Sequence, residues 1–168
     1  MRLSSAVLAK SRAMKDVLVG LGADPAAVVI TPSGADETLF HGGDPSKQAA
    51  HMLFVGRLIE KKGPLDALEA FAQARLLVSE PLKAEMRLRV VGDGPLQPAM
   101  QRCVNDLGLQ GCVDFLGVQP PKAVAHWMRQ SRCLLLPSRT ASDGDAEGCP
   151  VAVLEAQLSG LPVVSTRH

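Results

Sequence analysis

Short apolar segments alternate regularly with amphipathic segments along most of this chain, and no other feature constrains the fold as strongly. The apolar segments predict strands at 52–55, 88–91, 113–116, 133–136 and 162–164. The amphipathic segments predict helices between them, at 64–76, 96–107, 121–130 and 151–159. Because the connections are short, successive strands must run parallel, and their continuous apolar character fits strands buried on both faces. The alternation therefore predicts an α/β fold with a parallel sheet of about five strands and helices on both of its faces.

Composition and charge exclude several classes of protein. The 168 residues are 46% hydrophobic and 21% charged, which is typical of a globular domain, and the net charge of +1 gives no general attraction for nucleic acid. No apolar run is long enough to span a bilayer, and we recognise no signal peptide. The cysteines form no C-x-x-C pair and no metal-ligand spacing, so we expect free thiols and a reducing, cytoplasmic location.

Unusual residues follow four of the predicted strands. In parallel sheets ligands bind beyond the carboxyl ends of the strands, and glycine lets backbone approach a ligand closely. One alternative is that each glycine merely makes its own turn, but several on one rim favour a binding site. The residues at these strand ends are Gly56-Arg57, Gly92-Asp93-Gly94, Gly117-Val118 and Pro137-Ser138.

The first of these turns carries basic side chains suited to a diphosphate. Arg57 offers a planar pair of donors and Lys62 a compact charge, and both suit phosphate oxygens. Taken without context, the same residues are typical of a solvated basic loop.

The acidic loop 142–150 admits three interpretations. An EF-hand is excluded because Leu154 occupies the position of its bidentate glutamate and Pro150 interrupts the loop. A D-x-D metal site from Asp143 and Asp145 remains open, although the pair could equally be solvated charge.

The third interpretation is a pair of carboxylates, Glu147 and Glu155, on either side of a helix start. A helix amino terminus attracts anions through its free N–H groups and its dipole. The segment could thus place an anion site between two acids. For Glu155 an exposed helical glutamate is an equally good interpretation.

Six motifs, in order along the chain, resemble those of family-4 glycosyltransferases. Together they extend over about residues 29–167, and each is weak alone. They are Thr31-Pro32-Ser33-Gly34-Ala35-Asp36, the segment 54–63 with Gly56-Arg57-Leu58 and Lys62-Gly63, Gly92-Asp93-Gly94-Pro95-Leu96, Phe115-Leu116-Gly117, the E-x7-E pair Glu147 and Glu155, and the segment 156–167 with Gly160-Leu161-Pro162-Val163-Val164.

The resemblance implies a retaining GT-B enzyme of two Rossmann-like domains, whose second domain binds a UDP- or GDP-sugar without a metal or other cofactor. Arg57, Lys62 and Glu147 would form the catalytic group, with the two cations neutralising the leaving diphosphate and Glu147 contacting the donor sugar. Glu155 would hold the ribose. The remaining contacts to base, phosphate and sugar would come from Gly34, Gly56, Gly92, Gly117, Val118, Gly148, Cys149 and Val151.

The same resemblance suggests how the chain is organised. Residues 1–24 would be the tail of an acceptor domain and linker, and residues 25–168 an incomplete donor domain. The loop 140–148 is most similar to members that build bacterial surface polysaccharides, so the acceptor would be a sugar or lipid-linked glycan. Any peripheral association with a membrane would be made by the rest of the N-terminal domain.

The sequence departs from the family pattern at two positions of the 150s helix start. Cys149 replaces a larger apolar residue, and Pro150 removes one N–H group from the phosphate cradle. Two other functions stay open: a non-catalytic nucleotide-binding fragment, and an NAD-dependent oxidoreductase. The second is disfavoured because Gln97 stands where a G-x-G-x-x-G motif needs its third glycine.

Overall fold

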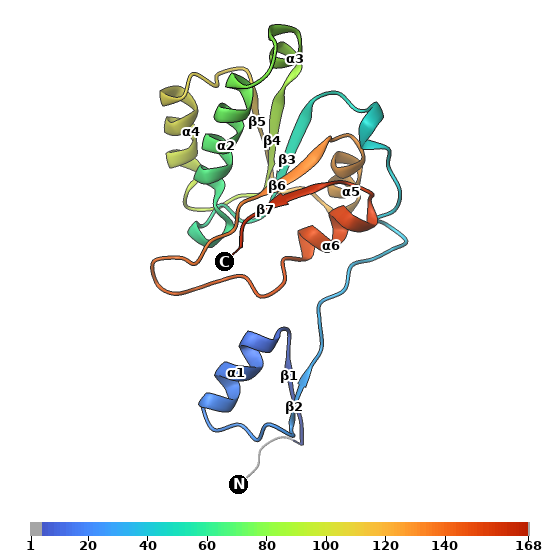
Figure 1. Cartoon of the computed structure of the whole chain (residues 1–168), viewed down its shortest axis with the longest axis vertical. Coiled ribbons are helices and arrows are strands. Elements are labelled where there is room, and N and C mark those ends of the chain that lie inside the picture. The colour runs from blue at the N-terminus through green and yellow to red at the C-terminus, as the bar shows by residue number, and fades with distance from the viewer. Residues whose placement is uncertain (1–4, 168) are drawn as a thin grey trace.

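The computed structural model describes residues 5–167 and consists of a five-stranded α/β layer structure joined to a small β-α-β unit (Figure 1). The strands are β1 Val7–Ala9, β2 Val28–Ile30, β3 His51–Val55, β4 Arg87–Val91, β5 Val113–Gly117, β6 Cys133–Leu136 and β7 Val163–Ser165. The α-helices are α1 Arg12–Gly20, α2 Pro64–Leu76, α3 Glu80–Glu85, α4 Gln97–Asp106, α5 Pro121–Arg129 and α6 Val151–Leu158, and the 3-10 turns are η1 Pro45–Lys47 and η2 Glu60–Lys62.

The main sheet confirms the parallel arrangement predicted from the alternation. Its strands lie in the order β5-β4-β3-β6-β7, and every neighbouring pair is parallel. The neighbours β3 and β6 are not consecutive in the chain, so the strand order reverses between them. In sheets of this type the crevice at such a reversal is the usual ligand site.

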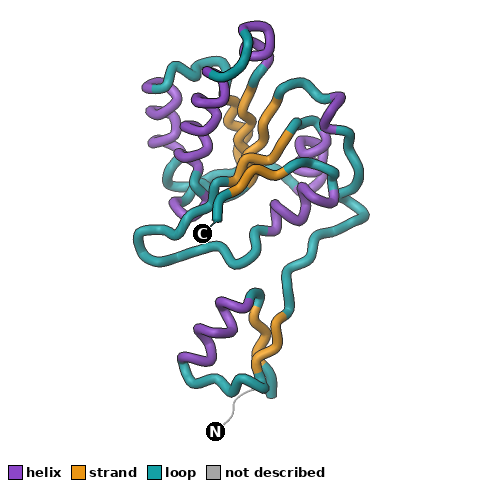
Figure 2. Tube along the Cα trace, in the orientation of Figure 1, coloured by secondary structure: helices purple, strands orange, loops and turns teal. Residues whose placement is uncertain are grey.

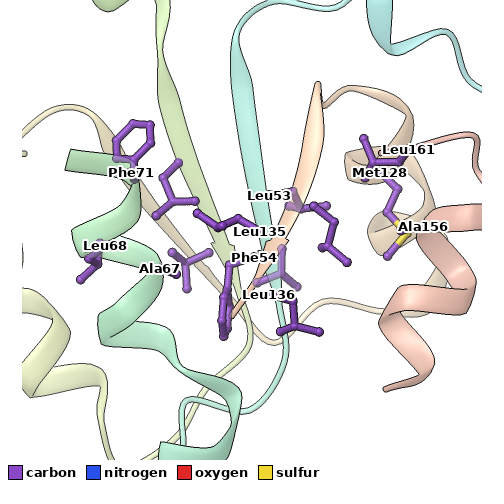
Figure 3. Close-up of a cluster of buried hydrophobic side chains, with 14 of the residues drawn as sticks. Leu53, Phe54, Ala67, Leu68, Phe71, Met128, Leu135, Leu136, Ala156 and Leu161 are labelled. Atoms are coloured by element: carbon purple, nitrogen blue, oxygen red, sulfur yellow. The ribbon is translucent and has the colours of Figure 1, made fainter. Parts of the chain in front are cut away.

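Helices cover both faces of this sheet, as predicted. Figure 1 shows α2 and α4 on one face and α5 and α6 on the other. Figure 3 shows Phe71 of α2 and Met128 of α5 on opposite sides of the strands that carry Leu53 and Leu136. All four side chains are at most 1% exposed, and each such burial is worth roughly 1.5–3 kcal/mol.

A separate parallel pair of strands precedes the main sheet. Val7 of β1 pairs with Val28 of β2, and α1 connects the two strands. The sequence analysis did not predict β1. The boundary that it placed after residue 24 falls inside this β-α-β unit, and Figure 2 shows a long loop leading from β2 to the main body.

The structure also contains a short helix that the sequence analysis did not predict. Pro81 lies beyond the end of α2, in the first turn of α3. Proline is tolerated there because the first N–H groups of a helix have no partner within it. No helix among residues 5–167 is both long and apolar enough to cross a membrane.

Candidate functional site

The turn that follows β3 forms one wall of the candidate site. Its last residue, Gly63, has a φ of 61° and precedes Pro64, the first residue of α2. A Cβ atom at Gly63 would lie 1.9 Å from the carbonyl oxygen of Pro137, just beyond β6. Only glycine therefore allows the turn after β3 to pack against the end of β6, at the point where the strand order reverses.

The loop between β6 and α6 folds back onto this turn and forms the opposite wall. The N–H group of Arg139 donates to the carbonyl of Lys61 at 2.9 Å, and the hydroxyl of Ser142 donates to Glu60 at 2.7 Å. The Ser142 contact holds the pKa of the Glu60 carboxyl below its ordinary value. Further along the loop, the ammonium of Lys61 lies 2.9 Å from Asp145 Oδ2. These contacts fix the loop against the 3-10 turn η2.

Glu147 reaches the same turn and pairs with its last lysine. The ammonium of Lys62 lies 3.0 Å from Glu147 Oε1, and the ammonium of Lys61 lies 3.9 Å from the same oxygen. The Glu147 side chain is only 9% exposed. Within residues 5–167, Oε1 nevertheless accepts no hydrogen bond of good geometry, so charge alone holds the pair. This buried oxygen can still accept a hydrogen bond from a ligand.

A cavity of about 390 Å³ lies between these two walls and the start of α6. Its volume is within the range of small-molecule sites. For Arg57, no carboxylate in the described part of the chain lies within ion-pair distance. The residues that line the cavity are Val55, Gly56, Arg57, Lys61, Lys62, Glu147, Cys149, Pro150, Val151 and Ala152.

Half of the residues predicted for the site line this cavity. Arg57 and Lys62 share it with the amino-terminal residues of α6, whose first N–H groups have no carbonyl partner within the helix. Had the two cations and the helix start lain on separate surfaces, no diphosphate could have met all three. The predicted residues that line the cavity are Gly56, Arg57, Lys62, Glu147, Cys149 and Val151.

The other predicted residues lie outside the lining. Gly148 packs beside Ser11, so that a Cβ atom there would lie 3.3 Å from the serine hydroxyl. Val118 is exposed after β5, and Gly34 lies in the loop that follows β2. None of these three residues lines the cavity that contains Lys62.

Two further predicted glycines have contacts with protein backbone. Gly92 packs against Gly56, and its N–H group donates to the carbonyl of Gly117 at 2.8 Å. The sequence analysis expected such glycines to approach a ligand. For Gly92 the close neighbour in this structure is the adjoining strand end.

Glu155 lies on α6, one turn beyond the residues that line the cavity. Partial burial raises the pKa of its carboxyl above the ordinary value. A carboxylate at such a border is stabilised by hydrogen-bond donors, which the hydroxyls of a sugar could provide.

The acidic loop has a different arrangement from the D-x-D metal site left open above. Both carboxylate oxygens of Asp145 lie within 3.0 Å of the Lys61 ammonium. Asp143 instead accepts a hydrogen bond from the N–H group of Asp145, at 2.9 Å. Among residues 5–167 no three His, Cys, Asp or Glu side chains gather as metal ligands. The absence of a metal in function remains a prediction.

Two charged residues of this site escaped the sequence analysis in their present role. The sequence analysis assigned no role to Lys61, and it weighed Asp145 as a metal ligand or as solvated charge. Both belong to a network that joins Asp145, Lys61, Glu147 and Lys62. The available signal was the excess of bases in the turn 56–63 and of acids in the loop 142–150, but sequence spacing does not show that the two segments meet.

Comparison with protein families identifies the chain. A family model described as glycosyl transferases group 1 matches residues 49–168. The chain belongs to this glycosyltransferase family. The matched range includes all residues that line the cavity, and the family named from the sequence motifs is confirmed.

Several curated relatives are about one-third identical to this family member. The amylovoran biosynthesis glycosyltransferase AmsK of Erwinia amylovora is 34% identical over 160 residues, covering 94% of this chain and 38% of the relative. The putative colanic acid biosynthesis glycosyltransferase WcaL of Escherichia coli K12 is 34% identical over 151 residues, covering 88% of this chain and 36% of the relative. The chain thus spans less than two-fifths of the length of these relatives.

Solved glycosyltransferase structures share the fold. Anabaena Alr3699/HepE, in a complex with UDP and glucose, superimposes with a TM-score of 0.74 at 23% identity, over 96% of this chain and 44% of that one. WaaG, a glycosyltransferase involved in lipopolysaccharide biosynthesis, gives a TM-score of 0.75 at 21% identity, over 94% and 43%. These likenesses confirm the predicted Rossmann-like GT-B architecture.

Proposed function

We propose that this chain binds the diphosphate of a nucleoside-diphosphate sugar and forms the donor-binding part of a retaining glycosyltransferase. The observation that carries the proposal is the cavity in which Arg57, Lys62 and the amino terminus of α6 converge. A diphosphate needs positive charge and directed donors, and these three elements supply both. The donor would be a UDP- or GDP-sugar.

The cationic side chains would act where charge develops. As the bond between the sugar and the diphosphate breaks, negative charge grows on the departing phosphate oxygens. Arg57 and Lys62 would stabilise that charge electrostatically without a metal ion. Arg57 is suited to this role because no acid in the described chain neutralises it.

Glu147 would bind the donor sugar. Its Oε1 is buried and accepts no good hydrogen bond within the described chain, so a sugar hydroxyl would supply the missing donor. Glu155 would accept hydrogen bonds from the ribose. Gly117 and Val118 would meet the base through their backbone, while Gly34, Gly56, Gly92, Gly148, Cys149 and Val151 would border the phosphates and sugar.

The relatives support a role in bacterial surface polysaccharide synthesis. AmsK and WcaL carry names from amylovoran and colanic acid biosynthesis, and HepE was solved with UDP and with UDP-glucose. We infer an acceptor that is a sugar or a lipid-linked glycan, bound by the part of the protein that precedes this domain. The four free cysteines agree with a cytoplasmic site of action.

A second candidate is nucleotide binding without transfer by this chain alone. It is favoured by the chain's coverage of only 38% of AmsK and 36% of WcaL. Donor binding would then be present, while glycosyl transfer would require the remainder that the relatives possess. We expect this chain to bind UDP or GDP weakly and to transfer no sugar.

Calorimetry with UDP, GDP, ADP and NAD tests both candidates and the oxidoreductase alternative. We expect heat of binding with UDP or GDP and none with NAD. Tight NAD binding without a response to UDP or GDP would reject the donor-site proposal. An assay for sugar release and transfer from UDP- and GDP-sugars then separates the candidates, since full transfer by this chain alone would contradict the second.

A further inference from the structure

Both cations that approach Glu147 do so through one of its oxygens. Lys62 lies 3.0 Å from Oε1 and Lys61 lies 3.9 Å from it. The Glu147 side chain is 9% exposed, whereas the lysines are 15% and 17% exposed. In the free protein, therefore, a nearly buried carboxylate depends on two lysines that are adjacent in the sequence.

Binding of a diphosphate in the cavity would change this arrangement. Lys62 lines the cavity, and a diphosphate there would draw its ammonium toward the phosphate oxygens. Glu147 would then lose its nearest positive charge while remaining buried. An isolated buried carboxylate is strongly disfavoured and takes up a proton rather than stay charged.

Lys61 is placed to prevent that protonation. Asp145 lies 2.9 Å from its ammonium, so Lys61 is anchored to the acidic loop and not only to the turn η2. The other charged side chain that lines the cavity is Arg57, which has no ion-pair partner within residues 5–167 and is free to follow the diphosphate. Lys61 is consequently the cation that can stay with Glu147 after Lys62 and Arg57 have turned to the ligand.

We propose that Lys61, anchored by Asp145, is a positioning residue that keeps Glu147 ionised and in place when a diphosphate draws Lys62 away. Glu147 then meets the donor sugar as a carboxylate, which accepts hydrogen bonds from two or more hydroxyls. The inference rests on the proposed diphosphate site, and it assigns to Lys61 a role separate from direct contact with phosphate.

Proton uptake on binding of UDP distinguishes this role from a general effect of charge. Calorimetry at pH 7.5, where the terminal phosphate of UDP is already almost fully ionised, in buffers of different ionisation enthalpy gives the number of protons taken up per bound UDP. We expect Lys61→Met to take up more protons than the wild type, because Glu147 then has neither lysine beside it when UDP is bound. Lys61→Arg, which keeps the charge, should restore the wild-type number.

The matched control is Lys47→Met, which removes an exposed lysine that pairs with nearby Asp44 at 3.0 Å. It should leave the wild-type proton number unchanged. Thermal unfolding of each variant checks that the compared proteins are folded. If Lys61→Met is unfolded, Lys61→Gln replaces it with the same expected excess of protons.

The experiment distinguishes failure of the proposed function from failure of the role of Lys61. A wild-type chain that binds neither UDP nor GDP would overturn the proposed function and this inference together. A wild type that binds UDP, with the same proton uptake as the neutral Lys61 variants, would overturn the role of Lys61 alone.

Discussion

A Cβ atom at Gly92 would lie 1.9 Å from the carbonyl oxygen of Gly56, so the ends of β4 and β3 are in direct backbone contact. Gly92 also has a φ of 132°, a conformation that side-chain-bearing residues rarely adopt. Its N–H group donates to Gly117 at 2.8 Å, which extends the contact to the third strand end. The rim beneath the candidate site is therefore fixed by backbone packing before any ligand arrives.

Replacing Gly92 with alanine should destabilise the chain. The added methyl group has no space beside the Gly56 carbonyl, and relieving the clash requires the ends of β3 and β4 to separate. We expect a loss of at least about 2 kcal/mol in the free energy of unfolding, from overpacking and backbone strain together. Urea denaturation followed by circular dichroism measures this loss.

Gly111→Ala is the matched control for that experiment. Gly111 also has a positive φ, of 72°, but no atom lies within 4 Å of its Cβ position. Its replacement should lower the free energy of unfolding by only about 1 kcal/mol, because alanine is strained in this left-handed conformation but meets no other atom. Equal losses at the two positions would contradict the contact between Gly92 and Gly56.

The main sheet could be predicted from the sequence because each of its strands carries its own local signal. Leu53 and Phe54 belong to a short apolar run, and the helix that follows begins at Pro64 and presents Leu68 and Phe71 to one face. Such patterns depend only on neighbouring residues, so the positions of strands and helices follow from them. The consecutive strands β3 and β4, β4 and β5, and β6 and β7 are also neighbours in the sheet, which agrees with the general tendency of consecutive strands to lie side by side.

The charge network could not be predicted in the same way. Lys61 meets Asp145, and Lys62 meets Glu147, only because the loop after β6 folds back onto η2. That contact is set by tertiary packing at Gly63 and Pro137, which no local pattern reveals. The family motifs located Arg57, Lys62 and Glu147 but did not show that Lys61 shares the Glu147 oxygen.

Replacing Lys62 with alanine should weaken diphosphate binding. A charge-assisted contact to phosphate is worth about 1.5–3 kcal/mol, which corresponds to a loss of affinity for UDP or GDP of tenfold or more. Lys47→Ala, which removes an exposed lysine paired with Asp44, serves as the control and should bind as the wild type does. Unchanged affinity in Lys62→Ala, measured by calorimetry, would argue against the proposed site.

His51 should make stability depend on pH below neutrality. Burial, with a smaller contribution from Arg89 and Arg87, lowers the pKa of its imidazole below 6.5, while Asp114 and Glu85 act in the opposite sense. The unfolded chain therefore takes up the proton first as the pH falls, and the free energy of unfolding decreases from about pH 6.5 downward until the folded-state pKa is passed.

The expected decrease in the free energy of unfolding is below about 1 kcal/mol, because the imidazole ring of His51 is only partly removed from water. His51→Gln should reduce this slope between pH 7.5 and 5, and the control His126→Gln, at an exposed position on α5, should retain it. Denaturation midpoints across that pH range measure the slope. An identical slope in wild type and His51→Gln would assign the effect to other groups.

Ser138→Ala should be neutral or stabilise the chain, although Ser138 is completely buried. Its hydroxyl oxygen has no hydrogen-bond partner among residues 5–167, whereas the hydroxyl of the equally buried Ser131 donates to the Trp127 carbonyl at 2.8 Å. Removing an unsatisfied buried hydroxyl abolishes a desolvation cost, while Ser131→Ala loses a bond worth about 1 kcal/mol.

Ser138 borders a cavity of about 370 Å³ that Arg139 and Thr166 also line. A loss in Ser138→Ala as large as that in Ser131→Ala, measured by urea denaturation, would therefore mean that ordered water in this cavity satisfies the hydroxyl.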